Sequence, residues 1–217
     1  MSDRETVLQR IRQRLKVSER AGAVDERLQQ RPLGPVPARA CGDAATLRER
    51  FVERAEAASA EVRQPPRGEP LPTTLADLVA GADGEIVTDE ALRAEWRGGA
   101  GRAVCRRARP EDALAVSAAL CGVAETGTLV LASGPGRPIT AAFLPPVHVA
   151  AVDAADIVGG YEAAWERVRA AGAWPRAVTW ITGPSRSADI EQTLNLGAHG
   201  PLRLIIVLRN GQEAFRE

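Results

Sequence analysis

Residues 128–152 read TLVLASGPGRPITAAFLPPVHVAAV, which is two apolar runs joined by a stretch rich in glycine and proline. Short apolar runs bounded by turn residues are typical of strands that are buried on both faces of a sheet. We therefore expect strands at 128–132 and 147–152, in an α/β domain whose mostly parallel sheet is covered by helices. Other apolar runs predict further strands at 84–88, 102–106, 114–118, 177–182 and 202–208.

Helical patterns alternate with these strands and also fill the beginning of the chain. Residues 1–73 are expected to form an N-terminal helical region with proline-rich linkers, and residues 74–217 the α/β domain. In the first helix, over 2–16, Ser2 and Glu5 form a capping box before a stripe of apolar residues at helical spacing. The other expected helices lie at 44–63, 75–80, 90–97, 159–171 and 187–195.

Charge and length limit the partners and the compartment. The chain of 217 residues balances 28 Lys and Arg against 28 Asp and Glu, so it has no surplus of positive charge for binding nucleic acid. The charged N-terminus is unlike a secretory signal, and no apolar run reaches the roughly 18 residues of a membrane span. We expect a cytoplasmic protein without a membrane span.

The reactive side chains are few and scattered. The three cysteines, Cys41, Cys105 and Cys121, form no CxxC pair for zinc or an iron–sulfur cluster. The two histidines, His148 and His199, are too far apart in sequence for an HExxH motif. We therefore expect neither a metal site nor a cofactor bound by this chain.

The first candidate site is a turn that precedes an apolar strand. It places Glu125, Thr126, Gly127 and Thr128 together, which gives a carboxylate and two hydroxyls beside a flexible backbone position. The same residue types also occur in ordinary turns with a solvated glutamate, and this alternative remains open.

The second candidate site follows the strand at 177–182. Ser185 or Ser187 is suited to cap a helix, whose N-terminus attracts anions, and Arg186 is suited to contact a phosphate or a carboxylate. An N-capped helix with a solvent-facing arginine is an equally simple interpretation. The residues expected to bind ligand here are Gly183, Pro184, Ser185, Arg186, Ser187 and Asp189.

The third candidate site is the segment GAHGP at 197–201. His199 lies between small residues, close to a glycine that lets the backbone approach a ligand, and its pKa is expected near neutrality. A structural role for this histidine also remains open. His148 lies inside an apolar strand and is expected to be a hydrogen-bonded residue of the core.

These segments carry a family resemblance. The sequence resembles the lactate utilization protein C family, or LUD domain, in AETGTLVL at 124–131, in Arg137, in FLPPVHVAAV at 143–152, and in GPSRSADIEQTLNLGAHGP at 183–201. The resemblance implies a fold similar to the NagB/RpiA/CoA-transferase group, whose ligands are often sugar phosphates or coenzyme A. It also implies action beside iron–sulfur subunits that oxidise L-lactate to pyruvate.

Three functional hypotheses follow. In the first, the chain is a non-redox component of a lactate-oxidising complex that binds a small anionic ligand or assists the iron–sulfur subunits. In the second, it is a free-standing enzyme of the CoA-transferase or phosphosugar type, with Glu125 as nucleophile or base. In the third, it is a structural assembly subunit. We further expect Glu125 and His199 to share a catalytic pocket, with Thr126, Gly127, Thr128 and Arg137 as ligand-binding neighbours.

Overall fold

The computed structural model describes residues 3–15, 26, 34–80, 85–96, 102–188, 194–196 and 200–211. The chain divides into two compact units, Met1–Val36 and Pro37–Glu217. In the first unit, helix α1 (Asp3–Leu15) occupies most of the helix expected over 2–16, and Ser2 of the expected capping box lies outside the described residues. The other elements whose bounds are described lie in the second unit.

A parallel six-stranded sheet forms the centre of the second unit, and its strand pairs all run parallel. Its central strands are apolar on successive residues because both faces are covered. In spatial order the strands are β1 (Glu61–Arg63), β12 (Arg203–Arg209), β7 (Val147–Asp153), β4 (Leu114–Ala118), β2 (Glu85–Thr88) and β3 (Arg102–Val104). The predicted α/β class with a mostly parallel sheet is confirmed.

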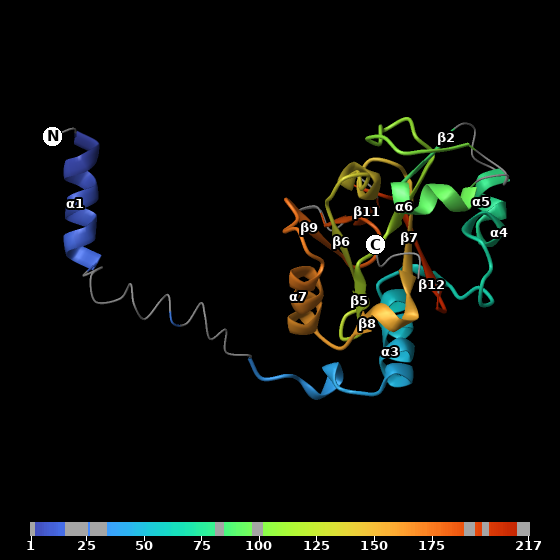
Figure 1. Cartoon of the computed structure of the whole chain (residues 1–217), viewed down its shortest axis with the longest axis horizontal. Coiled ribbons are helices and arrows are strands. Elements are labelled where there is room, and N and C mark those ends of the chain that lie inside the picture. Colours follow the sequence, from blue (N-terminus) through green and yellow to red (C-terminus); the bar gives the residue numbers. More distant parts are fainter. Residues whose placement is uncertain are drawn as a thin grey trace. The chain divides into compact units, whose positions relative to one another are not determined.

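Short helices cover one face of this sheet. They are α4 (Leu71–Thr74), α5 (Ala76–Ala80), α6 (Glu90–Arg93) and the 3-10 helix η2 (Ala94–Trp96). Leu71, Leu75 and Leu92 from these segments join one buried cluster with Val149 of β7 and Ile205 of β12. Figure 1 shows α4 and α5 on the opposite side of β7 and β12 from α7.

A second sheet and helix α3 (Ala44–Ala57) cover the other face. The strands of this second sheet, in spatial order, are β8 (Ile157–Val158), β5 (Cys121–Val123), β6 (Thr128–Ala132) and β9 (Val178–Ile181). Alternate residues of β6 point to opposite sides: Leu129 packs toward α3 and the large sheet, and Val130 packs toward helix α7 (Tyr161–Ala170). The second unit is therefore layered, with helices on both outer faces.

The expected elements agree with the structure where the apolar runs are long. The strands predicted at 114–118 and 128–132 have the bounds that the structure gives. The helix predicted over 44–63 ends earlier, at Ala57, because residues 61–63 form β1 and pair with β12. The helix predicted over 187–195 is wrong in its described part, since β10 (Arg186–Ala188) pairs antiparallel with β11 (Leu194–Leu196).

The boundary between the compact units falls between Val36 and Pro37. Helix α3 packs into the core of the second unit, and β1 is an edge strand of its large sheet. The expected division into domains at 1–73 and 74–217 stays a prediction. In the part of the chain that the structure describes, no helix has the length and apolar character needed to span a membrane.

Helix α3 contacts the second sheet at glycine residues. At Gly127, in the turn before β6, a Cβ atom would lie 2.3 Å from the backbone nitrogen of Ala55 in α3. The same residue has a φ of 68°, in the left-handed region that favours glycine. At Gly183, which follows β9, a Cβ atom would lie 2.1 Å from the carbonyl oxygen of Ala58. Both glycines therefore allow the end of α3 to approach neighbouring backbone.

A buried carboxylate lies at the carboxyl end of β2. Asp89 is buried, and its Oδ2 accepts a hydrogen bond of 2.7 Å from the backbone N–H of Ala118, the last residue of β4. Burial raises the pKa of Asp89 to about 6, although this hydrogen bond and the positive charge of Arg137 act in the opposite direction. Ionised Asp89 consequently destabilises the folded protein at neutral pH.

Replacing Gly127 by alanine tests the contact with α3. We expect Gly127→Ala to lower the free energy of unfolding by about 3 kcal/mol, because a left-handed φ and a backbone clash act together. Gly172→Ala is the matched control, since Gly172 has a φ of 87° and no atom within 4 Å of the added Cβ. Gly172→Ala should lower the free energy of unfolding, measured by urea denaturation, by only about 1 kcal/mol. Equal losses in the two variants would show that the contact contributes nothing.

Replacing Asp89 by asparagine tests the buried carboxylate. Because the folded-state pKa is raised, protonated Asp89 favours the folded state at low pH, and this contribution is lost as pH rises through about 6. Asp89→Asn should therefore be more stable than wild type by about 1–3 kcal/mol at pH 8 and equally stable near pH 4. Asp112→Asn should instead be less stable than wild type at pH 8, because Arg106 lowers the pKa of Asp112 and the ionised carboxylate favours the folded state. Denaturation curves at both pH values measure these differences. A loss of stability in Asp89→Asn at pH 8 would contradict the raised pKa of Asp89.

Candidate functional site

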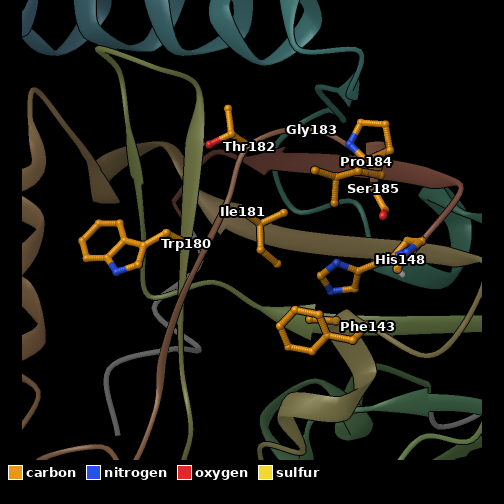
Figure 2. Close-up of a pocket in the computed structure, with 12 residues that line it drawn as sticks. Phe143, His148, Trp180, Ile181, Thr182, Gly183, Pro184 and Ser185 are labelled. Carbon is orange, nitrogen blue, oxygen red and sulfur yellow. The ribbon is translucent and has the colours of Figure 1, made fainter. Parts of the chain in front are cut away.

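A pocket of about 230 Å³ lies where β9 ends and where β7 and β12 begin. Figure 2 shows the residues that surround it, including the segment from Trp180 to Ser185. The described lining residues come from separate parts of the chain: Ala142, Phe143, His148, Trp180, Ile181, Thr182, Gly183, Pro184, Ser185, Gly200, Pro201 and Leu204.

Sheet register brings these parts together. In the large sheet, His148 of β7 pairs with Leu204 of β12, so the segments that precede the two strands lie at the same edge. The backbone N–H of Arg203 donates to the carbonyl of Pro146 at 3.1 Å. The backbone N–H of Ser185 donates to the carbonyl of Pro201 at 3.0 Å. These two hydrogen bonds connect the segments that precede β7 and β12 with each other and with the segment that follows β9.

His148 is the buried polar side chain of the pocket. It is fully buried, and its Nε2 lies 3.2 Å from the Oγ of Ser117 in β4. Its Nδ1 is also buried and has no hydrogen-bond partner in the described part of the chain. Burial lowers the pKa of His148 to about 4, so the imidazole is neutral at pH 7. A neutral imidazole can offer its second nitrogen to a ligand as either a donor or an acceptor, depending on its tautomer.

Hydroxyl groups connect the pocket with the turn before β6. The Oγ1 of Thr182, in the pocket wall, lies 2.7 Å from the Oγ1 of Thr128. Thr128 in turn lies 2.6 Å from the Oγ1 of Thr126 and 3.1 Å from the hydroxyl of Tyr161. Two of the predicted ligand-binding residues, Thr126 and Thr128, thus belong to a hydrogen-bonded network behind the pocket.

Glu125 lies in the same turn but contacts a different part of the protein. Its Oε1 accepts a hydrogen bond of 2.7 Å from the Nε of Arg39, in the 3-10 helix η1 (Ala38–Ala40). The side chain of Glu125 is only 10% exposed, and it is not among the described residues that line the pocket. Its predicted partner His199 lies outside the described residues, so their shared pocket stays a prediction.

The predicted anion site after β9 has a different local structure from the one expected. Arg186 donates hydrogen bonds to the carbonyl of Ala58 and to the hydroxyl of Ser59, just beyond the end of α3. Ser187 lies in β10 opposite Asn195, in place of the expected helix N-terminus. The described residues after β9 therefore offer no helix N-terminus to an anion. Gly183, Pro184 and Ser185 of the predicted group do line the pocket.

The last two predicted ligand residues are not placed at the pocket. Asp189 lies outside the described residues. Arg137 lies in the turn after β6, in a bridge with Gly134, and is not among the described lining residues. It acts electrostatically on Asp89 at the carboxyl edge of the large sheet. In the described ranges no group of three or more His, Cys, Asp or Glu is arranged to hold a metal ion.

The sequence did not predict that His148 and Phe143 line this pocket. His148 was expected in the core, and it is buried and hydrogen-bonded as expected, but it also forms part of the pocket wall. Its position two residues after the Pro145-Pro146 break, at the start of a strand, was the signal available in the sequence.

Comparison with known proteins gives a family match for the second half of the chain. Residues 102–208 match the LUD domain family. The uncharacterized protein NMB1437 of Neisseria meningitidis is 42% identical over 92 residues, which are 42% of this chain and 40% of that protein. Lactate utilization protein C of Geobacillus sp. is 38% identical over 90 residues, 40% of this chain and 37% of that protein. The matches thus span about two fifths of the length of these relatives.

A solved structure supports the fold. The crystal structure of a DUF162 family protein from Deinococcus radiodurans superposes with a TM-score of 0.62 at 19% sequence identity, and the match covers 79% of this chain and all of that one. The sequence match and the shared α/β architecture agree with each other. Residues 102–208, just under half of the chain, belong to the LUD domain family.

Proposed function

We propose that this LUD-domain chain takes part in lactate utilization as a ligand-binding subunit, and that its ligand occupies the pocket beside His148. The relatives named lactate utilization protein C support the process. The presence of the pocket supports ligand binding as this chain's contribution to lactate utilization.

The convergence of separate segments on one pocket is the observation that carries the proposal. The lining residues come from the segments at 142–148, 180–185 and 200–204, all of them within the LUD match. These are also segments in which the sequence resembles the family. A fully buried histidine with an unsatisfied nitrogen at such a pocket is costly unless a ligand or a solvent molecule uses it.

We propose that partner subunits carry the electrons. Oxidation of lactate to pyruvate releases two electrons and two protons, and iron–sulfur subunits are suited to accept the electrons. The three cysteines of this chain lie apart, with Cys41 exposed, Cys105 half-buried and Cys121 buried. Our proposal is that this chain serves such cytoplasmic partners without holding a cluster itself.

The alternative of a free-standing enzyme with Glu125 as nucleophile has less support. A nucleophile must reach its substrate, whereas the carboxylate of Glu125 is bonded to Arg39 and lies outside the described pocket lining. The contact gives Glu125 a structural role, which is to attach η1 to the turn before β6. We therefore favour the ligand-binding subunit.

Growth on lactate tests the proposal. In a bacterial strain that has lost its own lactate utilization protein C, the full chain should restore growth on L-lactate. Ser185→Trp should abolish this rescue, because the larger side chain fills the pocket. Ala170→Trp adds the same bulk at the exposed end of α7 and should rescue like wild type.

Each variant must accumulate to the wild-type level, as measured by immunoblotting. Rescue by Ser185→Trp would refute the role of the pocket. A well-expressed wild-type chain that fails to rescue growth would refute the lactate role.

A further inference from the structure

A second group of polar side chains lies at the carboxyl edge of the large sheet, opposite the edge that holds the pocket. Asp89 follows β2, Cys105 follows β3, and the turn after β6 contacts both segments. In this turn the carbonyl of Gly136 accepts hydrogen bonds from the backbone N–H of Glu90 at 2.8 Å and from the Sγ of Cys105 at 3.5 Å. The group therefore lies at the edge where open parallel sheets commonly bind ligands.

Arg137 belongs to the same turn, and its guanidinium is unused. The other half-buried arginines in the described ranges each donate a hydrogen bond to another residue; these are Arg48, Arg50, Arg63, Arg106 and Arg167. Arg137 is also half-buried, but no hydrogen bond or ion pair joins its guanidinium to a described residue. A partly desolvated donor without a partner is unfavourable, and the planar guanidinium matches the oxygens of carboxylate and phosphate groups. Arg137 is therefore suited to bind an anion.

Asp89 is the buried carboxylate beside Arg137. Its side chain does not cap α6, and its Oδ2 accepts the hydrogen bond from Ala118 at 2.7 Å. Its Oδ1 accepts no hydrogen bond from a described residue. Oδ1 is also not one of the described polar atoms that are both buried and without a partner, so it reaches the protein surface. This oxygen of Asp89 is therefore open to a ligand that Arg137 holds.

The other charged and titratable groups near Asp89 leave the charge of Arg137 uncompensated. Glu90 of α6 is paired with Arg93 of the same helix at 2.6 Å. Burial raises the pKa of the Cys105 thiol, and the charge of Glu90 acts in the same direction, so this thiol is neutral at pH 7. Asp89 and Arg137 are consequently the pair whose charges an incoming anion would meet.

An anion on Arg137 changes the protonation of Asp89. Burial raises the pKa of Asp89 to about 6, and the positive charge of Arg137 limits this rise. A bound anion cancels part of that positive charge and repels the ionised carboxylate, so the pKa of Asp89 rises further.

We propose that Arg137 binds a small oxyanion, either a carboxylate or a phosphate-like group, and that Asp89 takes up a proton as the anion binds. This site goes beyond the proposed function, because it is separate from the pocket beside His148.

Two anions that do not titrate between pH 5.5 and 8, L-lactate and sulfate, test the site by isothermal titration calorimetry on the full chain. At least one of them should bind about five times more tightly at pH 5.5 than at pH 8, because affinity falls as pH rises through the pKa of Asp89. At pH 6.5, buffers with different ionisation enthalpies should reveal uptake of about half a proton per bound anion.

The two probes distinguish the sources of the oxyanion. Binding of lactate alone identifies a carboxylate ligand, binding of sulfate alone identifies a phosphate-like ligand, and binding of both identifies a general oxyanion site. Failure of both anions to bind at millimolar concentration would overturn the inference, and so would equal affinities at the two pH values.

Variants assign the two roles, with thermal melting as the check on folding. Arg137→Met should weaken binding about tenfold or more at pH 5.5, whereas Arg137→Lys keeps the charge and should retain part of the affinity. Arg176→Met is the matched control, because it removes an exposed arginine and should bind like wild type. Asp89→Asn should bind with equal affinity at pH 5.5 and pH 8 and without proton uptake. Unchanged binding in Arg137→Met, or wild-type proton uptake in Asp89→Asn, would overturn the inference.

The pocket variant separates this site from the proposed function. Ser185→Trp should bind the anion like wild type, although it is expected to abolish growth on lactate. Loss of anion binding in Ser185→Trp, together with unchanged binding in Arg137→Met, would place the anion in the pocket and refute the site at Arg137. Failure of the wild-type chain to restore growth would refute the lactate role and leave the anion site standing.

Discussion

The parallel pairing of β7 with β12 over seven residues, from Val147 with Arg203 to Asp153 with Arg209, determines where the pocket lies. It aligns the starts of the two strands, and hydrogen bonds then tie the preceding loops to each other and to the segment after β9. Ligands of open parallel sheets commonly bind beyond the carboxyl ends of the strands. Here the pocket lies at the amino ends of β7 and β12, because the carboxyl end of β9 in the second sheet lies at the same edge.

Helix α3 explains several residues that the sequence presents as candidate site residues. Gly127 and Gly183 allow close approach of the helix end, and Arg186 binds the carbonyl and hydroxyl groups just beyond it. The LUD match begins only at residue 102, yet α3 and β1 complete the core and the edge of its sheet. The sequence motifs therefore contribute residues both to the pocket lining and to the contact with helix α3.

The sequence predicted the fold better than the site. Long apolar runs such as 114–118 and 128–132 mark strands because burial on both faces leaves a strong local signal. β5 and β8 were missed because two or three residues are too few to show a period. The serine and acidic residues after Pro184 favoured a helix locally, but Arg186–Ala188 instead pairs antiparallel with Leu194–Leu196. The role of His148 depends on register and on an unsatisfied nitrogen, neither of which a sequence displays.

The central claim is that a buried, neutral His148 lines the pocket, and NMR of the imidazole nitrogens tests it most directly. The chain has two histidines, so a His199→Gln variant labelled with ¹⁵N-histidine isolates the signal of His148. The account predicts one protonated and one unprotonated nitrogen at all pH values from 8 down to 5, since burial lowers the pKa of His148 to about 4. An imidazole that titrates with an ordinary pKa near 6.5 would contradict it.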